Sequence, residues 1–309
     1  MYHQHPHSLS GKPLLEALAS GSELPAIPHA YLGGCGLTTF PQEVLKLSGL
    51  SALSLFDNQL SDIPDDISQL RFLKILNIAQ NLLTGVPEGI GTLAHLEMLD
   101  LGHNRIPVLP ASLGELANLV FLYASDNLLS SLPATFSALS RLQYLNITDN
   151  LFIELPVWIG RLSSLIELRV YNNSLGTLPV EIGQLSNLVE FHASKNQIQS
   201  LPDSIGHLSS LVKLNLQSNR ISALPDTIGN LRRLVELDLR FNAISELPST
   251  LTSLQSLEYL DLRANALTSV PDDLHKLANL RKVDLRWNRL VTRQHCLDVL
   301  ANRGCIVYT

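Results

Sequence analysis

The chain is 309 residues long, which fits one large domain or two ordinary ones. Leucine supplies 66 of these residues, whereas aromatic residues make up 6% and charged residues 16%, and this bias calls for a search for internal repeats. The net charge of −6, and apolar runs far shorter than the roughly 20 residues of a membrane-spanning helix, argue against a nucleic-acid binder and against membrane insertion.

The N-terminal region precedes the regular part of the chain. It shows no basic segment followed by an apolar one, so no secretory signal is visible, and three cysteines do not make a disulfide framework. We therefore expect a cytoplasmic monomer. His3, His5 and His7 alternate, which suits either a transition-metal chelate or a disordered tail. Residues 8–20 have the pattern of a short amphipathic helix, and we expect residues 1–22 to form an N-terminal helical cap.

A 23-residue period governs residues 23–290. Asparagine and proline each recur at steps of 23, in two series of eleven residues that start at Asn58 and Pro41. The frame around each asparagine is L-x-x-L-x-L-x-x-N, as in residues 50–58, and it continues with an apolar–Pro pair and I-x-x-L-x-x-L. One earlier repeat is in phase with Cys35 at the asparagine position, so the chain contains twelve repeats.

This frame is similar to that of the leucine-rich repeat (LRR) family, in the 23-residue class of plant Ras-group LRR proteins, animal Ras-pathway scaffolds and bacterial LRR effectors. The resemblance covers nearly the whole chain. It implies an α/β solenoid, a curved right-handed horseshoe with a parallel β-sheet on its concave face and short 3-10, helical or extended convex segments. It also implies protein binding and signalling, in a cytoplasmic scaffold or in a bacterial effector that is delivered into a host cell.

Each residue type in the frame has a physical role. The x-L-x-L-x segment alternates with period two, which predicts a short strand whose leucines point inward. The asparagine amide, at the end of the strand, is suited to pairing backbone groups that would otherwise be buried without partners. Proline suits the start of the return segment, and the Ile-Gly pairs suit a tight bend. Because one repeat cannot bury its own leucines, neighbouring repeats must stack.

The repeat pattern ends before the C-terminus. Thr292 is predicted to cap a helix over residues 293–303 that ends at Gly304. A last strand over residues 305–308 keeps the 23-residue phase. We expect residues 291–309 to form a C-terminal cap of a helix and a short strand that closes the exposed edge of the core.

The side chains between the strand leucines point out of the predicted concave face. In the first half they form an apolar stripe on consecutive strands about 4.8 Å apart, which is what a protein-binding hot spot requires. The alternative is that these side chains pack against each other or lie under the N-terminal segment. The predicted partner contacts are Phe56, Ile75, Met98, Phe121, Tyr123, Tyr144, Arg169, Tyr171 and His192.

The second half of the same face is charged. Its aspartates form one column and its arginines the next, which favours a mutually neutralising ladder over a charged surface that selects a partner. The aspartates are Asp238, Asp261 and Asp284, and the arginines are Arg240, Arg263 and Arg286.

Catalytic and cofactor motifs are missing. The sequence has no phosphate-binding glycine loop, no C-x-x-C and no H-E-x-x-H, so we predict a non-enzymatic protein without cofactor or metal. Cys296 and Asp298 resemble the Cys-x-Asp nucleophile motif of bacterial LRR-effector ubiquitin ligases, but a buried inert thiol in a short cap helix is the better interpretation. A further alternative is a recognition subunit whose output domain lies on a separate chain.

Overall fold

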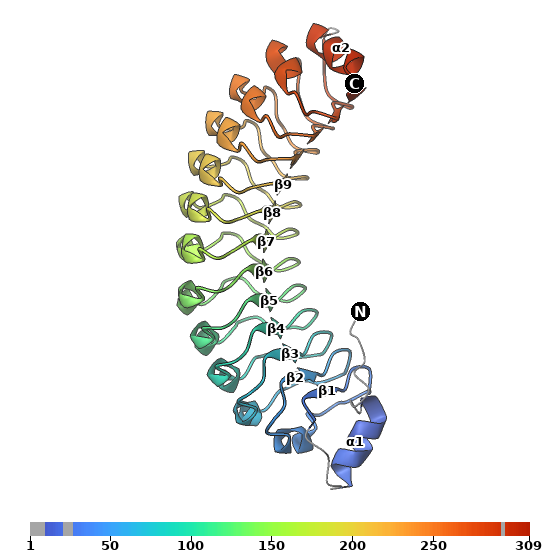
Figure 1. Cartoon of the computed structure of the whole chain (residues 1–309), viewed down its shortest axis with the longest axis vertical. Helices are drawn as coiled ribbons and strands as arrows, with labels where there is room; N and C mark the ends of the chain where they lie inside the picture. The colour runs from blue at the N-terminus through green and yellow to red at the C-terminus, as the bar shows by residue number, and fades with distance from the viewer. Residues whose placement is uncertain (1–9, 21–26, 292–293) are drawn as a thin grey trace. The chain divides into compact units, whose positions relative to one another are not determined.

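The structure is a computed structural model that describes residues 10–20, 27–291 and 294–309 (Figure 1). The chain divides into two compact units, Met1–Asn150 and Leu151–Thr309. The alternating histidines His3, His5 and His7 and the predicted helix cap Thr292 lie outside the described residues.

The first unit begins with helix α1 (Gly11–Ala19), which buries Leu14 and Leu18. Six short strands follow and pair in parallel, each with the next along the chain. They are β1 (His29–Tyr31), β2 (Ala52–Ser54), β3 (Ile75–Asn77), β4 (Met98–Asp100), β5 (Phe121–Tyr123) and β6 (Tyr144–Asn146). The 3-10 helices between them are η1 (Gln42–Lys46), η2 (Asp65–Gln69), η3 (Glu88–Thr92), η4 (Ala111–Glu115) and η5 (Ala134–Ala138).

The second unit repeats this pattern and ends with helix α2 (His295–Asn302) and an edge strand. Its strands, again parallel, are β7 (Glu167–Arg169), β8 (Glu190–His192), β9 (Lys213–Asn215), β10 (Glu236–Asp238), β11 (Tyr259–Asp261), β12 (Lys282–Asp284) and β13 (Ile306–Tyr308). Its 3-10 helices are η6 (Val157–Arg161), η7 (Val180–Gln184), η8 (Asp203–His207), η9 (Asp226–Asn230), η10 (Ser249–Ser253) and η11 (Asp272–Lys276).

The predicted solenoid of parallel strands joined by 3-10 turns is confirmed. The central residue of each repeat strand is buried and its two neighbours are mostly half-exposed, as in β3, where Leu76 lies between Ile75 and Asn77. Each 3-10 helix follows the repeat proline, whose fixed φ suits that position, and buries one apolar residue or more, such as Ile67 in η2. The period-two alternation therefore determines which residues of each strand enter the core and which face solvent.

The repeat asparagine bonds the backbone of two successive repeats. The Oδ1 atom of Asn81 accepts the N–H of Leu60 at 3.0 Å, in the preceding loop. Its Nδ2 atom donates to the carbonyl oxygen of Leu55 at 3.0 Å and to that of Ile78 at 3.1 Å. Because these groups are buried, each would otherwise lie unpaired, and the amide thereby stabilises the turn of one repeat against the next.

The residue before each repeat asparagine has a left-handed backbone, with φ between 51° and 64°. These residues are Asp57, Gln80, His103, Asp126, Asp149, Asn172, Lys195, Ser218, Phe241, Ala264 and Trp287. Side chains as large as Phe and Trp rarely adopt this conformation, so the repeat imposes it whatever the residue type. No common residue type marks this position in the sequence.

The glycines of the Ile-Gly pairs are required by close packing between turns rather than by a bend. A Cβ atom on Gly91 would lie 2.4 Å from the carbonyl oxygen of Ser112, and one on Gly183 would lie 2.3 Å from that of Ser204. None of these glycines has a left-handed φ. The 3-10 turns that carry these glycines therefore pack so tightly on the following turn that a Cβ atom would clash with its backbone.

The C-terminal cap differs in detail from the prediction. Its strand β13 begins at Ile306 and pairs Ile306 with Lys282, so it is one residue out of the predicted 23-residue phase. Helix α2 begins at His295 rather than at residue 293, because Gln294 has an extended backbone. Gly304 has a φ of +92° and ends the helix as predicted. Neither α1 nor α2, at nine and eight residues, approaches the length of a membrane-spanning helix, and none was found among the described residues.

We predict that Gly183→Ala lowers the free energy of unfolding by about 1–3 kcal/mol, because the added methyl group displaces the neighbouring 3-10 turn. Gly176→Ala is the matched control, since a Cβ there meets no atom within 4 Å. Thermal unfolding followed by circular dichroism measures both. Equal melting temperatures of the two variants would contradict the packing role.

Candidate functional site

The first unit presents an apolar, aromatic surface on the solvent-facing side of β2 to β6. We call it the aromatic face. Phe121 is 40% exposed and Phe56 is 38% exposed, and the remaining members are half-buried. Its members are Phe56, Ile75, Met98, Phe121, Tyr123 and Tyr144. They are thus the predicted contacts that belong to the first unit.

Parallel pairing brings these side chains together. Ile75, Met98, Phe121 and Tyr144 occupy the same register on β3 to β6. The ring of Tyr144 lies 6.4 Å from that of Phe121 and 4.8 Å from that of Tyr123, measured between centroids. The rings therefore pack on each other, as the alternative interpretation expected, yet Phe121 remains largely accessible to a partner.

Asp100 lies within the aromatic face, next to Tyr123 in register. Its Oδ1 atom accepts the N–H of Gly102 at 3.0 Å. Burial raises the pKa of Asp100, and the Gly102 N–H and the charge of His103 offset only part of that effect. Among the basic side chains that the structure describes, none forms an ion pair with Asp100.

The three predicted contacts in the second unit lie in a polar cluster on β7 and β8 and the loop that follows β7. Arg169 pairs with Glu167, and His192 lies 2.9 Å from Glu190 and 4.0 Å from Glu167. The hydrogen bond from His192 lowers the pKa of Glu190 below its ordinary value. Tyr171 is half-buried. The charged members are therefore already engaged with one another.

This polar cluster has the spacing of a metal site. Glu167, Glu190 and His192 offer ligand atoms that all lie within 4.8 Å of one another. The Arg169 guanidinium already neutralises Glu167, and His192 bonds Glu190, so ion pairs account for the arrangement without a metal.

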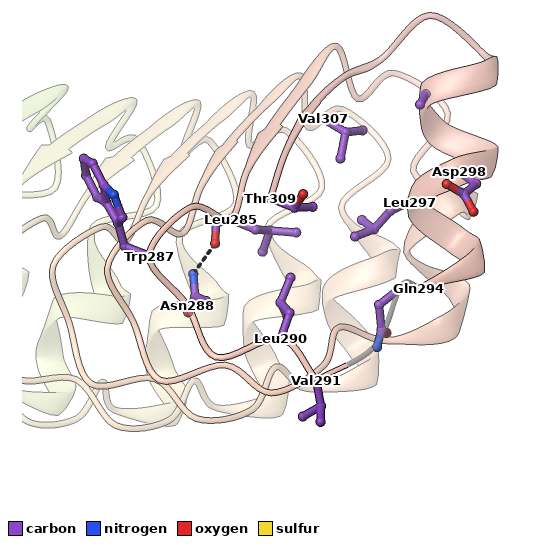
Figure 2. A pocket seen from close by; sticks show the side chains of 11 residues that line it. Leu285, Trp287, Asn288, Leu290, Val291, Gln294, Leu297, Asp298, Val307 and Thr309 are labelled. Atoms are coloured by element: carbon purple, nitrogen blue, oxygen red, sulfur yellow. Dashed lines mark hydrogen bonds between the residues drawn. The ribbon is translucent and has the colours of Figure 1, made fainter.

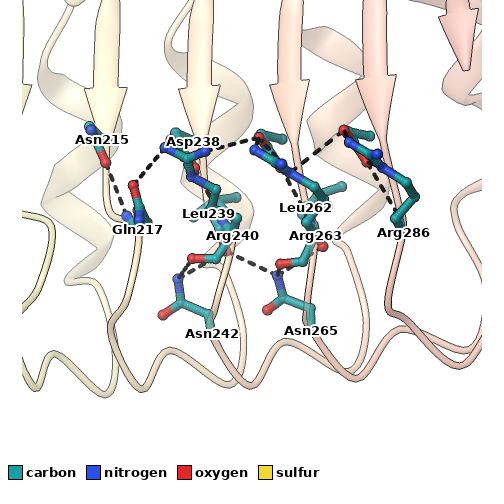
Figure 3. A network of polar contacts seen from close by, with 12 residues as sticks. Asn215, Gln217, Asp238, Leu239, Arg240, Asn242, Leu262, Arg263, Asn265 and Arg286 are labelled. Carbon is teal, nitrogen blue, oxygen red and sulfur yellow. Dashed lines mark hydrogen bonds and ion pairs between the residues drawn. The ribbon is translucent and has the colours of Figure 1, made fainter. Parts of the chain in front are cut away.

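The predicted neutralising ladder of the second unit is present in the geometry (Figure 3). Arg263 bonds its own Asp261 at 2.6 Å and approaches Asp284 at 3.6 Å. Burial alone would raise the pKa of Asp284, but the hydrogen bonds and charge of Arg286 turn the net shift downward. Burial dominates at Asp238, at the start of the ladder, and raises its pKa. The arginines are thus turned toward the protein's own carboxylates.

A pocket of about 680 Å³ lies between the last repeat and α2 (Figure 2). Trp287 and Leu297 contribute to its lining. Cys296 is not part of that lining, and its side chain is almost fully buried. Burial raises the pKa of Cys296, whereas a nucleophilic cysteine needs a lowered one. This environment suits the inert thiol and disfavours the ligase alternative.

Comparison with known proteins gives the class of the chain. The model of the leucine-rich repeat region matches residues 44–145, 133–216 and 192–302, and the chain therefore belongs to the leucine-rich repeat family. Solenoids of this kind use extended surfaces for protein interaction and are in general non-enzymatic scaffolds. No curated protein sequence matches the chain.

Several solved structures are similar. An LRR protein of Leptospira interrogans is 26% identical, with a TM-score of 0.53, over 98% of this chain and 100% of that one. The plant peptide hormone receptor RGFR1, in complex with RGF2, is 30% identical with a TM-score of 0.68, over 90% of this chain and 50% of its own. A TDR receptor is 28% identical with a TM-score of 0.78, over 89% and 49%. The chain thus spans about half the length of these two receptor chains.

We predict that Asp100→Asn raises the melting temperature by about 2 °C at pH 7, because it removes a half-buried charge that lacks a cationic partner. Asn77 already makes the equivalent bond, accepting the N–H of Ala79 at 3.0 Å. A carboxyl group whose pKa is raised by folding opposes folding while ionised. The gain is therefore present above the folded pKa and is lost as the pH falls through it.

The matched control is Asp261→Asn, which removes the negative charge and one of the two oxygens that accept from Arg263, and should lower the melting temperature. Differential scanning calorimetry from pH 3 to pH 7 checks both variants. A melting temperature of Asp100→Asn at or below that of the wild type at pH 7 would contradict the prediction.

Proposed function

We propose that the chain is a protein-interaction module that binds a protein partner through the aromatic face. The observation that carries this proposal is the stripe of Ile75, Met98, Phe121 and Tyr144, which lie in register on consecutive strands of a hydrogen-bonded sheet. Aromatic residues and methionine are enriched at the centres of protein interfaces, and a rigid sheet holds them at little cost in entropy.

The similarity to RGFR1 supports a polypeptide as the ligand. That protein is a plant peptide hormone receptor, and its structure is a complex with RGF2. Its likeness extends over 90% of this chain at 30% identity. In our proposal the chain carries no catalytic group of its own and serves as a cytoplasmic scaffold, as a bacterial effector or as the recognition subunit of an output protein on another chain.

Arg169, Tyr171 and His192 remain predicted contacts of the second unit. Because Arg169 and His192 pair with glutamates of the same unit, a partner would meet a neutralised polar surface there. Such surfaces contribute more to specificity than to affinity. We therefore assign the larger part of the binding energy to the aromatic face.

The test removes two rings from the aromatic face. Phe121→Ala combined with Tyr144→Ala should lower partner capture at least tenfold, because truncating central aromatic anchors costs about 2 kcal/mol or more each. The melting temperature should change little, since Phe121 is 40% exposed and Tyr144 is half-buried. Affinity capture from the native cell, quantified by mass spectrometry, is the measurement.

Phe72→Ala is the control for this experiment. Phe72 is 60% exposed but lies between η2 and β3, stacked on His95, rather than on the strands. It should retain the full set of captured proteins. If the double variant captures the same proteins as the wild type, the aromatic face is not the binding surface.

A further inference from the structure

Four aspartates occupy the same position of the repeat, the last residue of a strand, where each lies between two buried apolar residues. Each accepts, through Oδ1, the N–H of the residue two places later. They are Asp100, Asp238, Asp261 and Asp284, with distances of 3.0, 3.2, 3.2 and 3.4 Å. The shared bond gives the four carboxylates the same orientation relative to their strands.

The four differ in the residue that makes this bond. In the second unit it is an arginine, whose guanidinium turns back onto the carboxylate (Figure 3). The Nε and Nη2 atoms of Arg263 donate to the Oδ1 and Oδ2 atoms of Asp261 at 2.9 and 2.6 Å. Arg286 donates to Asp284 at the same two distances. At Asp100 the corresponding residue is Gly102, so the sequence reads Asp-Leu-Gly instead of Asp-Leu-Arg.

Because Gly102 has no side chain, this repeat itself places no guanidinium over Asp100. A Cβ atom at Gly102 would lie 3.2 Å from Oδ1 of Asp100 and 3.3 Å from Oγ of Ser125. Gly102 does not have a left-handed φ, so its backbone would accept a side chain. The repeat therefore does not demand glycine here for its backbone conformation, and its effect is that the half-buried Asp100 carboxylate has no arginine of its own repeat to pair with.

The surroundings of Asp100 favour a cation from outside. The solvent-facing strand positions of β2 to β6 hold no lysine or arginine. The turns after these strands add Asp57, Asp126 and Asp149, and His103 is engaged with Asp126 at 2.8 Å. Tyr123 is the register partner of Asp100 on the neighbouring strand, Phe121 lies two residues before it, and aromatic rings attract guanidinium groups.

We infer that Asp100 receives an arginine side chain of the protein partner, whose guanidinium takes the place over Asp100 that Arg263 takes over Asp261. The inference rests on the proposed function of the aromatic face. It commits to arginine because two parallel N–H donors match the two carboxylate oxygens, whereas a lysine ammonium supplies only a point charge. The rings and Met98 then contact apolar residues that flank the arginine.

The experiment uses a displayed library of random peptides, selected against the full chain. The expected result is a family of peptides with arginine next to apolar residues. One such peptide is then synthesised with arginine, lysine or citrulline at that position, and its affinity is measured by titration calorimetry. Citrulline keeps the shape and removes the charge, so it should bind at least tenfold more weakly, and lysine should also lose affinity.

Variants of the chain test whether the arginine of the peptide contacts Asp100. Asp100→Asn should lower the affinity for the arginine peptide at least tenfold, and a melting temperature no lower than that of the wild type excludes unfolding as the cause. Gly102→Arg should do the same, because the chain's own guanidinium would cover Asp100. Gly102→Ala adds the Cβ without the charge and should retain binding, as should Asp62→Asn, which removes an exposed acid outside the strands.

The outcomes distinguish failure of the arginine site from failure of the proposed binding function of the aromatic face. If peptide binding is lost in the Phe121→Ala, Tyr144→Ala variant but persists in Asp100→Asn, the arginine site is overturned and the aromatic face stands. If the selected peptides bind through the aromatic face without a preference for arginine, the arginine site is likewise overturned and the aromatic face stands. If no selected peptide depends on Phe121, Tyr144 or Asp100, both proposals fail.

Discussion

The structure depends on the side-chain amide of the asparagine that recurs in eleven of the twelve repeats. This side chain accepts an N–H from the preceding loop and donates to carbonyl groups of its own and of the preceding repeat, as Asn196 does with Leu175, Ala193 and Val170. The chain must leave the strand and turn through the interior, and there the backbone has no strand or helix partner. Without the amide, several polar groups would be buried unpaired in every repeat. The fixed distance from asparagine to asparagine is therefore what holds each leucine in phase with the next.

Much of the fold follows from the sequence because its signals are local and repeated. The alternation around each strand, the asparagine and the proline each determine the structure of only a few residues. The same signals recur from repeat to repeat. The left-handed residue before each asparagine could not be found this way, since the position holds Asp, Lys, Phe, Ala and Trp alike and carries no common residue type. The role of Gly183 also depends on a contact with Ser204 in another repeat, which no single-repeat pattern reveals.

The candidate site was only partly accessible from the sequence. Period two identifies which aromatic residues face solvent, so the members of the aromatic face could be named in advance. Whether Arg169 and His192 point to a partner or to Glu167 and Glu190 depends on side-chain geometry, which spacing does not define. Asp100 was missed because an aspartate among aspartates is not conspicuous. The sequence feature that marks it is Asp-Leu-Gly, where three later repeats have Asp-Leu-Arg at the same position. This difference becomes meaningful only when the structure shows the arginines paired with their aspartates.

At the left-handed position before each repeat asparagine, the backbone conformation does not depend on the type of side chain. Since the conformation is held by the hydrogen bonds of the repeat, such as that from the N–H of Asn81 to the carbonyl oxygen of His103, the side chain there is not chosen for its backbone preference. Phe241 and Trp287 demonstrate the range, since their rings lie 6.3 Å apart although Ala264 occupies the position between them in sequence. Substitutions at these positions can therefore alter the polarity, size or charge of the surface while the backbone stays the same. The row of such residues is thus a surface whose binding specificity can change with little loss of stability.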